Sequence, residues 1–75
     1  MIDMLQAVLF LKSKWNTKDA RNHLKKEKLK PIKRVHTTDK YHRYRITTPN
    51  YDKYDYIIKR GLNDIDYIIG IEKKN

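Results

Sequence analysis

The sequence predicts an α+β fold of two layers, in which one helix packs on a four- to five-stranded, mainly antiparallel sheet in the order β-α-β-β-β-β. Three observations lead to this class: an early continuous apolar run, one capped helical segment, and four later strand-length segments bounded by turn signals. The 75 residues leave room for one domain, spanning residues 1–75, because a shorter unit would bury too little core.

The first strand is expected in the apolar run Ala7–Lys12, which follows a short lead-in over Met1–Leu5. The run has the length of a strand and no alternation, which is typical of a central strand buried on both faces. Trp15 follows shortly after this run, and we expect it to plug the core over the sheet rather than to stand exposed.

One helix is predicted from an N-cap at Asn16 to about Lys28. The Asn side chain can accept a hydrogen bond from a free N–H group of the first turn. Ala20 and Leu24 give this helix a narrow apolar stripe. Pro31 is expected to end the helix, because proline lacks an N–H group and restricts the residue before it.

The segment Lys33–Ile46 is predicted to form a β-hairpin around a turn at Asp39-Lys40, because both arms alternate. Like charges that lie directly opposite in a sheet repel by about 0.2–1 kcal/mol per pair, so an anion over such a face would relieve a cost. The register expected from this turn pairs Val35 with Tyr44 and Lys33 with Ile46 on the inner face, and Arg34 with Arg45 and His36 with Arg43 on the outer face.

A second strand pair is expected in Tyr56–Arg60 and Ile65–Glu72, joined by a turn at Gly61–Asp64. Alternation of Ile and Tyr in the last strand predicts that one of its faces is buried. If the protein self-associates, the apolar first strand and this isoleucine-rich last strand are expected to supply the edge.

The charge is concentrated in one half of the chain, whose formal net charge is +9. Thirteen Lys and Arg residues lie between Lys12 and Arg45, against only three acidic residues. A coat that serves solubility alone would be spread more evenly. The positive field would attract polyanions: nucleic acid first, then an acidic protein or an anionic membrane surface.

Catalytic and metal-binding motifs are not evident. The chain has no Cys, only one Ser, and two Gly residues that form no phosphate-binding loop. His36 and His42 are expected on opposite faces of the hairpin, without metal-ligand spacing, so we expect no metal and no cofactor. Asp64 and Asp66 could hold Mg²⁺ in a nuclease, but two acids beside a turn are usually solvated, so an enzyme is the third-ranked reading.

A series of short motifs runs along most of the chain. They are VLF, a lysine and Trp15, then Ala20-Arg21, Leu24-Lys25-Lys26, Lys30-Pro31-Ile32-Lys33, Val35, Tyr41–Ile46 and Tyr67-Ile68-Ile69-Gly70. In order and spacing these motifs resemble a small basic domain found in large double-stranded DNA viruses and in proteins linked to phage heads. The resemblance implies a viral setting, in an infected host cell or a virion, and no particular activity.

The function expected from these features is non-enzymatic binding of nucleic acid, DNA more than RNA, through phosphate contacts with little sequence preference. The alternative is a minor virion structural or adaptor module that docks an acidic protein. A soluble protein is expected, without a signal peptide or membrane span, because the longest apolar stretch is too short. The candidate binding residues are Arg34, His36, Tyr41, Arg43 and Arg45 of the hairpin, and Arg21, Lys25, Lys26, Lys28 and Lys30 of the helical region.

Overall fold

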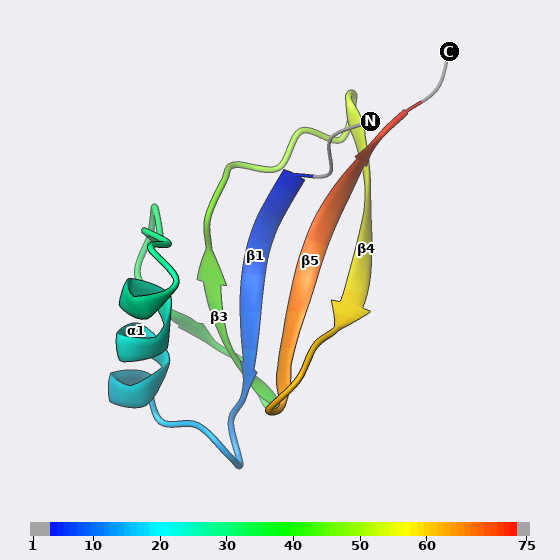
Figure 1. The fold of residues 1–75 in the computed structure, drawn as a ribbon. Helices are drawn as coiled ribbons and strands as arrows, with labels where there is room; N and C mark the ends of the chain where they lie inside the picture. The colour runs from blue at the N-terminus through cyan, green and yellow to red at the C-terminus, as the bar shows by residue number, and fades with distance from the viewer. Residues whose placement is uncertain (1–3, 74–75) are drawn as a thin grey trace.

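The structure, a computed structural model, describes residues 4–73 and contains one helix on one face of a five-stranded sheet (Figure 1). Its strand order is β2-β3-β1-β5-β4, and every neighbouring pair is antiparallel. The predicted α+β class and element order are confirmed. The elements are β1 (Met4–Leu11), α1 (Thr17–Lys26), β2 (His36–Thr37), β3 (Tyr41–Arg45), β4 (Tyr54–Arg60) and β5 (Ile65–Glu72).

Strand β1 is the middle of the sheet, as the apolar run predicted, and residues 6–10 are buried. It begins at Met4 rather than Ala7, so the predicted lead-in is largely strand; Met1–Asp3 lie outside the described residues. The register toward β5 shifts between Leu5 and Ala7, which makes Gln6 the extra residue of a β-bulge. The bulge thus places the polar side chain of Gln6 within an otherwise apolar strand.

Helix α1 begins where the sequence predicted: the Oδ1 atom of the N-cap Asn16 accepts a hydrogen bond from the N–H of Asp19 at 2.7 Å. It ends at Lys26, two residues before the predicted end at about Lys28, and Pro31 is therefore not the residue that ends it. The N–H of Lys28 donates to the carbonyl of Lys25, and that of Leu29 to the carbonyl of Leu24. These two bonds form a Schellman motif with Lys28 at φ 60°, a position usually held by glycine.

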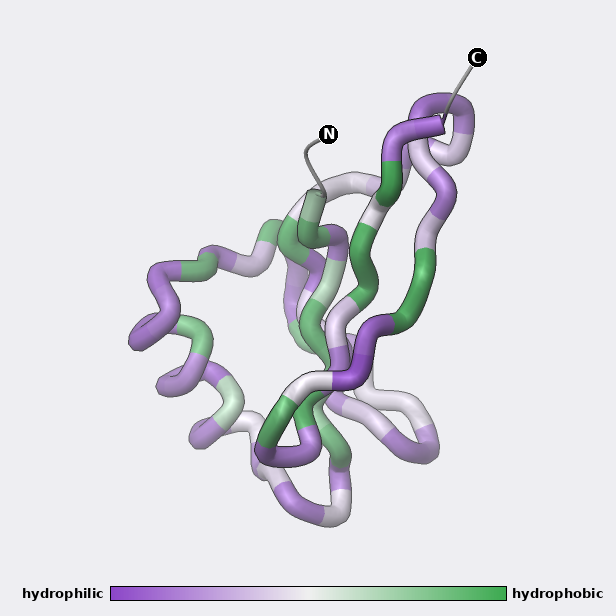
Figure 2. The backbone as a smooth tube through the Cα atoms, turned by 45° about the vertical axis from the view of Figure 1, so that its right-hand side comes forward, coloured by the Kyte–Doolittle hydropathy of each residue, from purple (hydrophilic) through white to green (hydrophobic). Residues whose placement is uncertain are grey.

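The core lies between α1 and the face of the sheet that the helix covers. The apolar stripe of the helix packs there, while most other helix positions are hydrophilic (Figure 2). Trp15 is the predicted plug: its ring meets the ring of Phe10 edge to face at 5.1 Å, and its Nε1–H donates to the carbonyl of Asn63. The buried apolar cluster consists of Val8, Phe10, Ala20, Leu24, Tyr44 and Ile65.

The two edges of the sheet are β2 and β4, not the strands expected from hydrophobicity. Both β1 and β5 are paired on two sides, so the expected self-association edge in the first and last strands is wrong. The isoleucines of β5 are explained by its interior position. Strand β4 begins at Tyr54, two residues before the predicted start.

Candidate functional site

The face of the sheet opposite α1 carries part of the predicted cationic set. In β3 the side chains of His42 and Tyr44 are buried, whereas those of Tyr41, Arg43 and Arg45 are half-buried. Tyr44 belongs to the core beneath the helix, so the three alternate residues lie on the open face. Pairing of His36 with Arg43 is confirmed and brings the histidine to the same face.

Arg34 is not on that face as predicted, because the hairpin arm does not continue as a strand before His36. The N–H of Ile32 donates to the carbonyl of Arg45 at 2.9 Å, which leaves residues 33–35 opposite Tyr44 alone. Residues 33–35 therefore form a bulge away from the sheet edge, which is separate from the β-bulge at Gln6. This arrangement removes the expected repulsion between Arg34 and Arg45, which is a physical reason for the chain to leave the register.

The other pairs predicted for the inner face also fail as strand pairs. Lys33 does not lie opposite Ile46, because the bulge begins immediately after Ile32. Val35 lies outside β2 as well, yet its side chain is half-buried against the core, close to where the pattern placed it. The prediction was thus correct for the inward direction of Val35 and wrong for its ladder partner.

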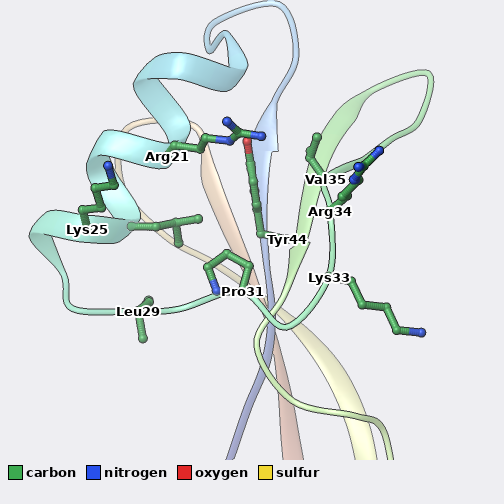
Figure 3. Close-up of a pocket in the computed structure, with 9 residues that line it drawn as sticks. Arg21, Lys25, Leu29, Pro31, Lys33, Arg34, Val35 and Tyr44 are labelled. Carbon is green, nitrogen blue, oxygen red and sulfur yellow. The ribbon is translucent and has the colours of Figure 1, made fainter.

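The bulge and the helix enclose a cationic groove (Figure 3). It has a volume of about 230 Å³ and an apolar floor. Arg21 and Lys25 line it from the same side of α1, one turn apart, and Lys33 and Arg34 line it from the bulge. In Figure 3 the guanidinium of Arg21 lies over the groove, whereas the charged ends of Lys33 and Arg34 extend outward, away from the helix. No carboxylate among residues 4–73 lines it. The floor consists of Leu24, Leu29, Pro31, Val35 and Tyr44.

The helix end explains the shape of this groove. Because the Schellman motif reverses the chain at Lys28, Leu29 packs against the core and the following residues run back beside the helix. Pro31 then holds the chain extended and offers no N–H group. The bulge therefore forms one wall of the groove. It faces the helix, from which only a few residues separate it in the sequence.

Tyr44 forms the base of the groove beneath the guanidinium group of Arg21 (Figure 3). Its hydroxyl donates to the carbonyl of Thr17 at 3.3 Å. Burial raises the pKa of the Tyr44 phenol, and the nearby positive charge of Arg21 opposes this rise. The tyrosine is therefore neutral at physiological pH and adds no negative charge to the groove.

On the open face, Arg43 is held by an amide. Its Nη2 group donates to Oε1 of Gln6 at 3.2 Å, while its Nε atom is buried without a partner in the described part of the chain. Gln6 also donates from Nε2 to the carbonyl of Thr47. The guanidinium charge of Arg43 is thus fixed in place but is not neutralised by this amide.

Tyr41 is engaged with an acidic residue. Its hydroxyl donates to Oδ2 of Asp66 at 2.9 Å, and this hydrogen bond is the main cause that raises the pKa of Tyr41. Asp66 lies opposite Arg60 in the sheet. The open face therefore combines its arginines with the carboxylate of Asp66, whereas no carboxylate of the described residues lines the cationic groove.

The remaining predicted residues, Lys26, Lys28 and Lys30, are exposed around the end of α1 but do not line the groove. None of the predicted cations pairs with a carboxylate within residues 4–73, where the ion pairs are His23 with Glu27 and Lys73 with Asp55. These ion pairs therefore do not neutralise the predicted cations. The cations lie on two faces around the β2–β3 edge instead of on one face.

Sequence reasoning missed two residues. Lys33 lines the groove although the hairpin pattern placed it on the inner face, and Gln6 positions Arg43 although it was not singled out. The proline two residues before Lys33 was the available signal for an irregular arm. A glutamine next to the apolar run could also have been noticed, because buried amides require partners.

The acidic residues considered for Mg²⁺ lie at the start of β5. Among residues 4–73, no three His, Asp or Glu side chains are grouped as metal ligands. Asp64 lies in the turn before β5 at φ 60°, and Asp66 is bound by Tyr41. No helix in this part of the chain has the length and apolarity required to cross a bilayer.

The fold and the site define a class, a one-helix α+β sheet domain with a cationic groove beside its shorter edge. Comparison of the chain with protein-family models, curated proteins and solved structures finds no significant match.

Proposed function

We propose that this chain is a non-enzymatic nucleic-acid-binding domain, DNA being preferred to RNA, that acts in a virus-infected cell or a virion. The observation that carries the binding proposal is the cationic groove, which combines four cations with no carboxylate. Phosphate oxygens are suitable partners for such a set, since guanidinium groups bind them through two parallel hydrogen bonds. The viral setting rests on the resemblance of the sequence motifs.

The groove would contact the phosphate backbone, and its apolar floor would contact sugars or the faces of bases. Arg21 and Lys25 stand on a rigid helix, so their spacing is fixed before binding, while Lys33 and Arg34 belong to the bulge. On the other side of the β2–β3 edge, Arg43 and Arg45 add charge. Contacts of this kind give affinity with little sequence preference.

The proposal is tested by fluorescence anisotropy with single-stranded DNA, duplex DNA and RNA of equal length at several salt concentrations. We expect the logarithm of the affinity for duplex DNA to fall linearly with the logarithm of salt, with a slope of about −0.9 for each phosphate contact. Affinity that stays constant between low and physiological salt would contradict the proposal.

A pair of variants of equal charge makes this test local to the groove. Arg21→Gln with Arg34→Gln should reduce the salt slope for duplex DNA by about 0.9 for each contact removed. The control, Lys14→Gln with Lys53→Gln, removes two exposed cations that do not line the groove and should change the slope much less. Equal losses in both variants would assign binding to net charge rather than to this site.

The apolar floor also favours a second candidate, an adaptor function in which an acidic segment of a virion protein occupies the groove. Polyglutamate serves as the probe that separates the two functions. If it binds at physiological salt as tightly as DNA of equal charge, and the variants of Arg21 and Arg34 weaken both equally, protein docking is the better description.

A further inference from the structure

Strand β4 leaves a long edge of the sheet open. It is the last strand in the sheet order, and Figure 1 shows no other described element beyond it. At the other edge, β2 has only two residues, and the cationic bulge of residues 33–35 precedes it in the chain. A short strand beside positive charges disfavours pairing with another strand. Strand β4 has seven residues, and its second half, from Ile57 to Arg60, is exposed.

The hydrogen-bonding pattern shows which backbone groups of β4 face outward. The N–H of Gly61 donates to the carbonyl of Ile65, and the N–H of Lys73 donates to the carbonyl of Lys53. With the constant register between these bonds, the odd-numbered residues of β4 bond to β5. The N–H and C=O groups of the even-numbered residues therefore point away from the sheet; these residues are Tyr54, Tyr56, Ile58 and Arg60. The N–H of Tyr54 already donates to the carbonyl of Asn50 at 3.0 Å, so the outward N–H groups open to a partner are those of Tyr56, Ile58 and Arg60.

The side chains of the same strand are apolar at its centre. Ile57 is 47% exposed and Ile58 is 65% exposed, one on each face, and neither belongs to the core. Neighbouring apolar residues on a free edge are a recognised liability, because they favour pairing with another strand. Pairing with a partner strand would cover these apolar side chains.

We propose that β4 pairs with β4 of a second copy of this chain, antiparallel, with Ile57 on the two-fold axis. This register joins the outward-facing groups, because it sets Tyr56 opposite Ile58 of the second copy and Tyr54 opposite Arg60. It also sets Asp55 opposite Lys59, and the two-fold axis repeats each pairing. The strand is thus complementary to itself in both shape and charge.

Charge selects this register over its neighbours. Only registers centred on Tyr56, Ile57 or Ile58 align the even-numbered backbone groups near the middle of the strand. Centring on Tyr56 places Lys53 opposite Lys59, and centring on Ile58 places Ile57 opposite Lys59. Opposite charges across strands stabilise and like charges destabilise a pair, so the Ile57 register is favoured.

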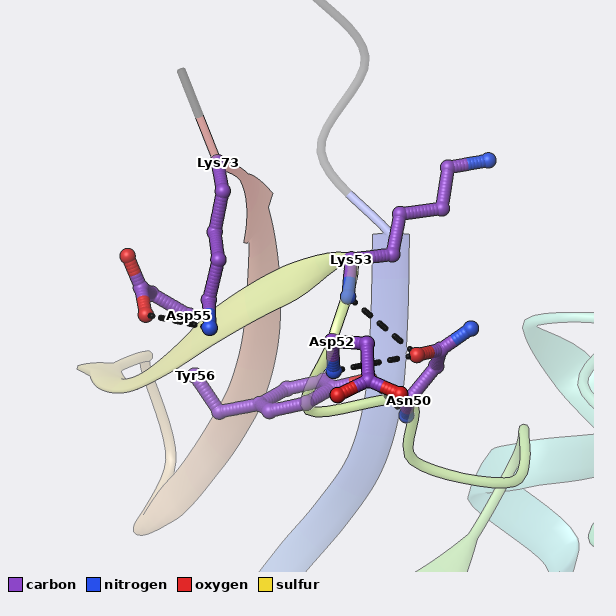
Figure 4. A network of polar contacts seen from close by, with 6 residues as sticks. All are labelled: Asn50, Asp52, Lys53, Asp55, Tyr56 and Lys73. Carbon is purple, nitrogen blue, oxygen red and sulfur yellow. Dashed lines mark hydrogen bonds and ion pairs between the residues drawn. The ribbon is translucent and has the colours of Figure 1, made fainter. Parts of the chain in front are cut away.

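The turn before β4 is closed by its own hydrogen bonds, and the carbonyl of Asn50 accepts the N–H of Tyr54 at the start of the strand. The Oδ1 atom of Asn50 accepts hydrogen bonds from the N–H groups of Asp52 and Lys53, and the hydroxyl of Tyr56 accepts one from the N–H of Asn50 (Figure 4). Asp55 contacts Lys73 of its own chain at 3.9 Å but remains 74% exposed. A carboxylate that is this exposed can still accept a contact from Lys59 of a second copy.

The dimer would be one continuous ten-stranded sheet, because five strands come from each copy. A two-fold axis perpendicular to the sheet places both helices on the same face and both cationic grooves at the far ends. The inference is independent of the proposed function, since no residue of the groove takes part in the pairing.

The test is sedimentation velocity over a series of protein concentrations. The wild-type chain should show a reversible monomer–dimer equilibrium. Lys59→Asp should shift it to the monomer, because two pairs of carboxylates would then face each other, and Asp55→Lys with Lys59→Asp together should restore the dimer. A wild-type chain that stays monomeric at the highest concentration, or a double variant that dimerises no better than Lys59→Asp, would overturn the proposal.

Hydrogen exchange reads the register directly. On raising the protein concentration, the amides of Tyr56, Ile58 and Arg60 should become protected, while those of Ile57 and Lys59 should not change, because they already bond to β5. Ile58→Pro removes one outward N–H without breaking the β4–β5 ladder and should abolish the concentration dependence. Protection that appears at odd-numbered residues, or remains in Ile58→Pro, would also contradict this pairing.

Discussion

Gln6 and Arg43 are joined across the open face of the sheet by a hydrogen bond of 3.2 Å from Nη2 of the arginine to Oε1 of the glutamine. The glutamine is the extra residue of the bulge in β1 and is almost fully buried. Its other amide atom, Nε2, donates to the carbonyl of Thr47 at 2.9 Å. One side chain therefore fixes both the guanidinium of β3 and the chain that follows this strand.

Replacing this amide should weaken the fold. Gln6→Leu is expected to lower the free energy of unfolding by about 1–3 kcal/mol, because the carbonyl of Thr47 and the guanidinium of Arg43 lose buried partners. Urea denaturation followed by circular dichroism measures the change. Combining Gln6→Leu with Arg43→Leu should recover part of the loss, since apolar groups then replace both partners. A loss below about 0.5 kcal/mol for Gln6→Leu would show that the amide is not a structural clamp.

The end of the helix offers a stabilising change. Lys28 has φ 60°, a conformation that costs an L-residue energy and that glycine adopts freely. Lys28→Gly should therefore raise the free energy of unfolding by roughly 1 kcal/mol. The same chemical change at Lys26, within α1, should lower stability by up to about 1 kcal/mol. The opposite signs can be compared in thermal unfolding, and destabilisation by both substitutions would contradict the assigned Schellman motif.

Local patterns predicted several elements correctly. The apolar run located β1, Asn16 marked the helix start, and the turn at Asp39-Lys40 gave the true pairing of His36 with Arg43. Each of these features depends on residues that are close in sequence. The carbonyl of Tyr41, for example, accepts the N–H of Thr38, so the turn is closed by its own residues.

Long-range pairing was not accessible in the same way. No local pattern specifies that β5 lies between β1 and β4. The apolar side chains of β1 and β5 therefore lead to the wrong prediction that these two strands form an exposed edge. The bulge before His36 depends on a bond between Ile32 and Arg45, which no local alternation reveals. As a consequence, Arg34 was grouped with the open face, and the cationic groove that it lines was not foreseen.

Alkaline pH should expose the burial of Tyr44. Because burial raises the pKa of Tyr44 above the ordinary tyrosine value of about 10, the unfolded chain releases this proton at lower pH than the folded chain. Stability is then unaffected by this group at neutral pH and falls as pH rises above about 10. Tyr44→Phe should reduce that fall in urea denaturation between pH 8 and about pH 11. The control Tyr51→Phe alters an exposed ring, and an equal effect of both substitutions would contradict the assignment.

The division of cations between two faces allows the binding surface to be located. Arg21→Gln with Arg34→Gln removes two charges from the cationic groove, whereas Arg43→Gln with Arg45→Gln removes two charges from the open face. We expect the groove variant to lose more affinity for duplex DNA, roughly tenfold or more at low salt, because Asp66 already offsets charge on the open face.

Anisotropy titrations at low and at physiological salt sharpen this comparison. At each salt concentration the groove variant should lose more affinity for duplex DNA than the open-face variant, although the two variants remove the same number of guanidinium groups. The difference should become smaller as salt rises, because salt screens the phosphate contacts that the groove variant removes. Larger losses from the open face at both salt concentrations would place the nucleic acid on the bare side of the sheet, away from the helix.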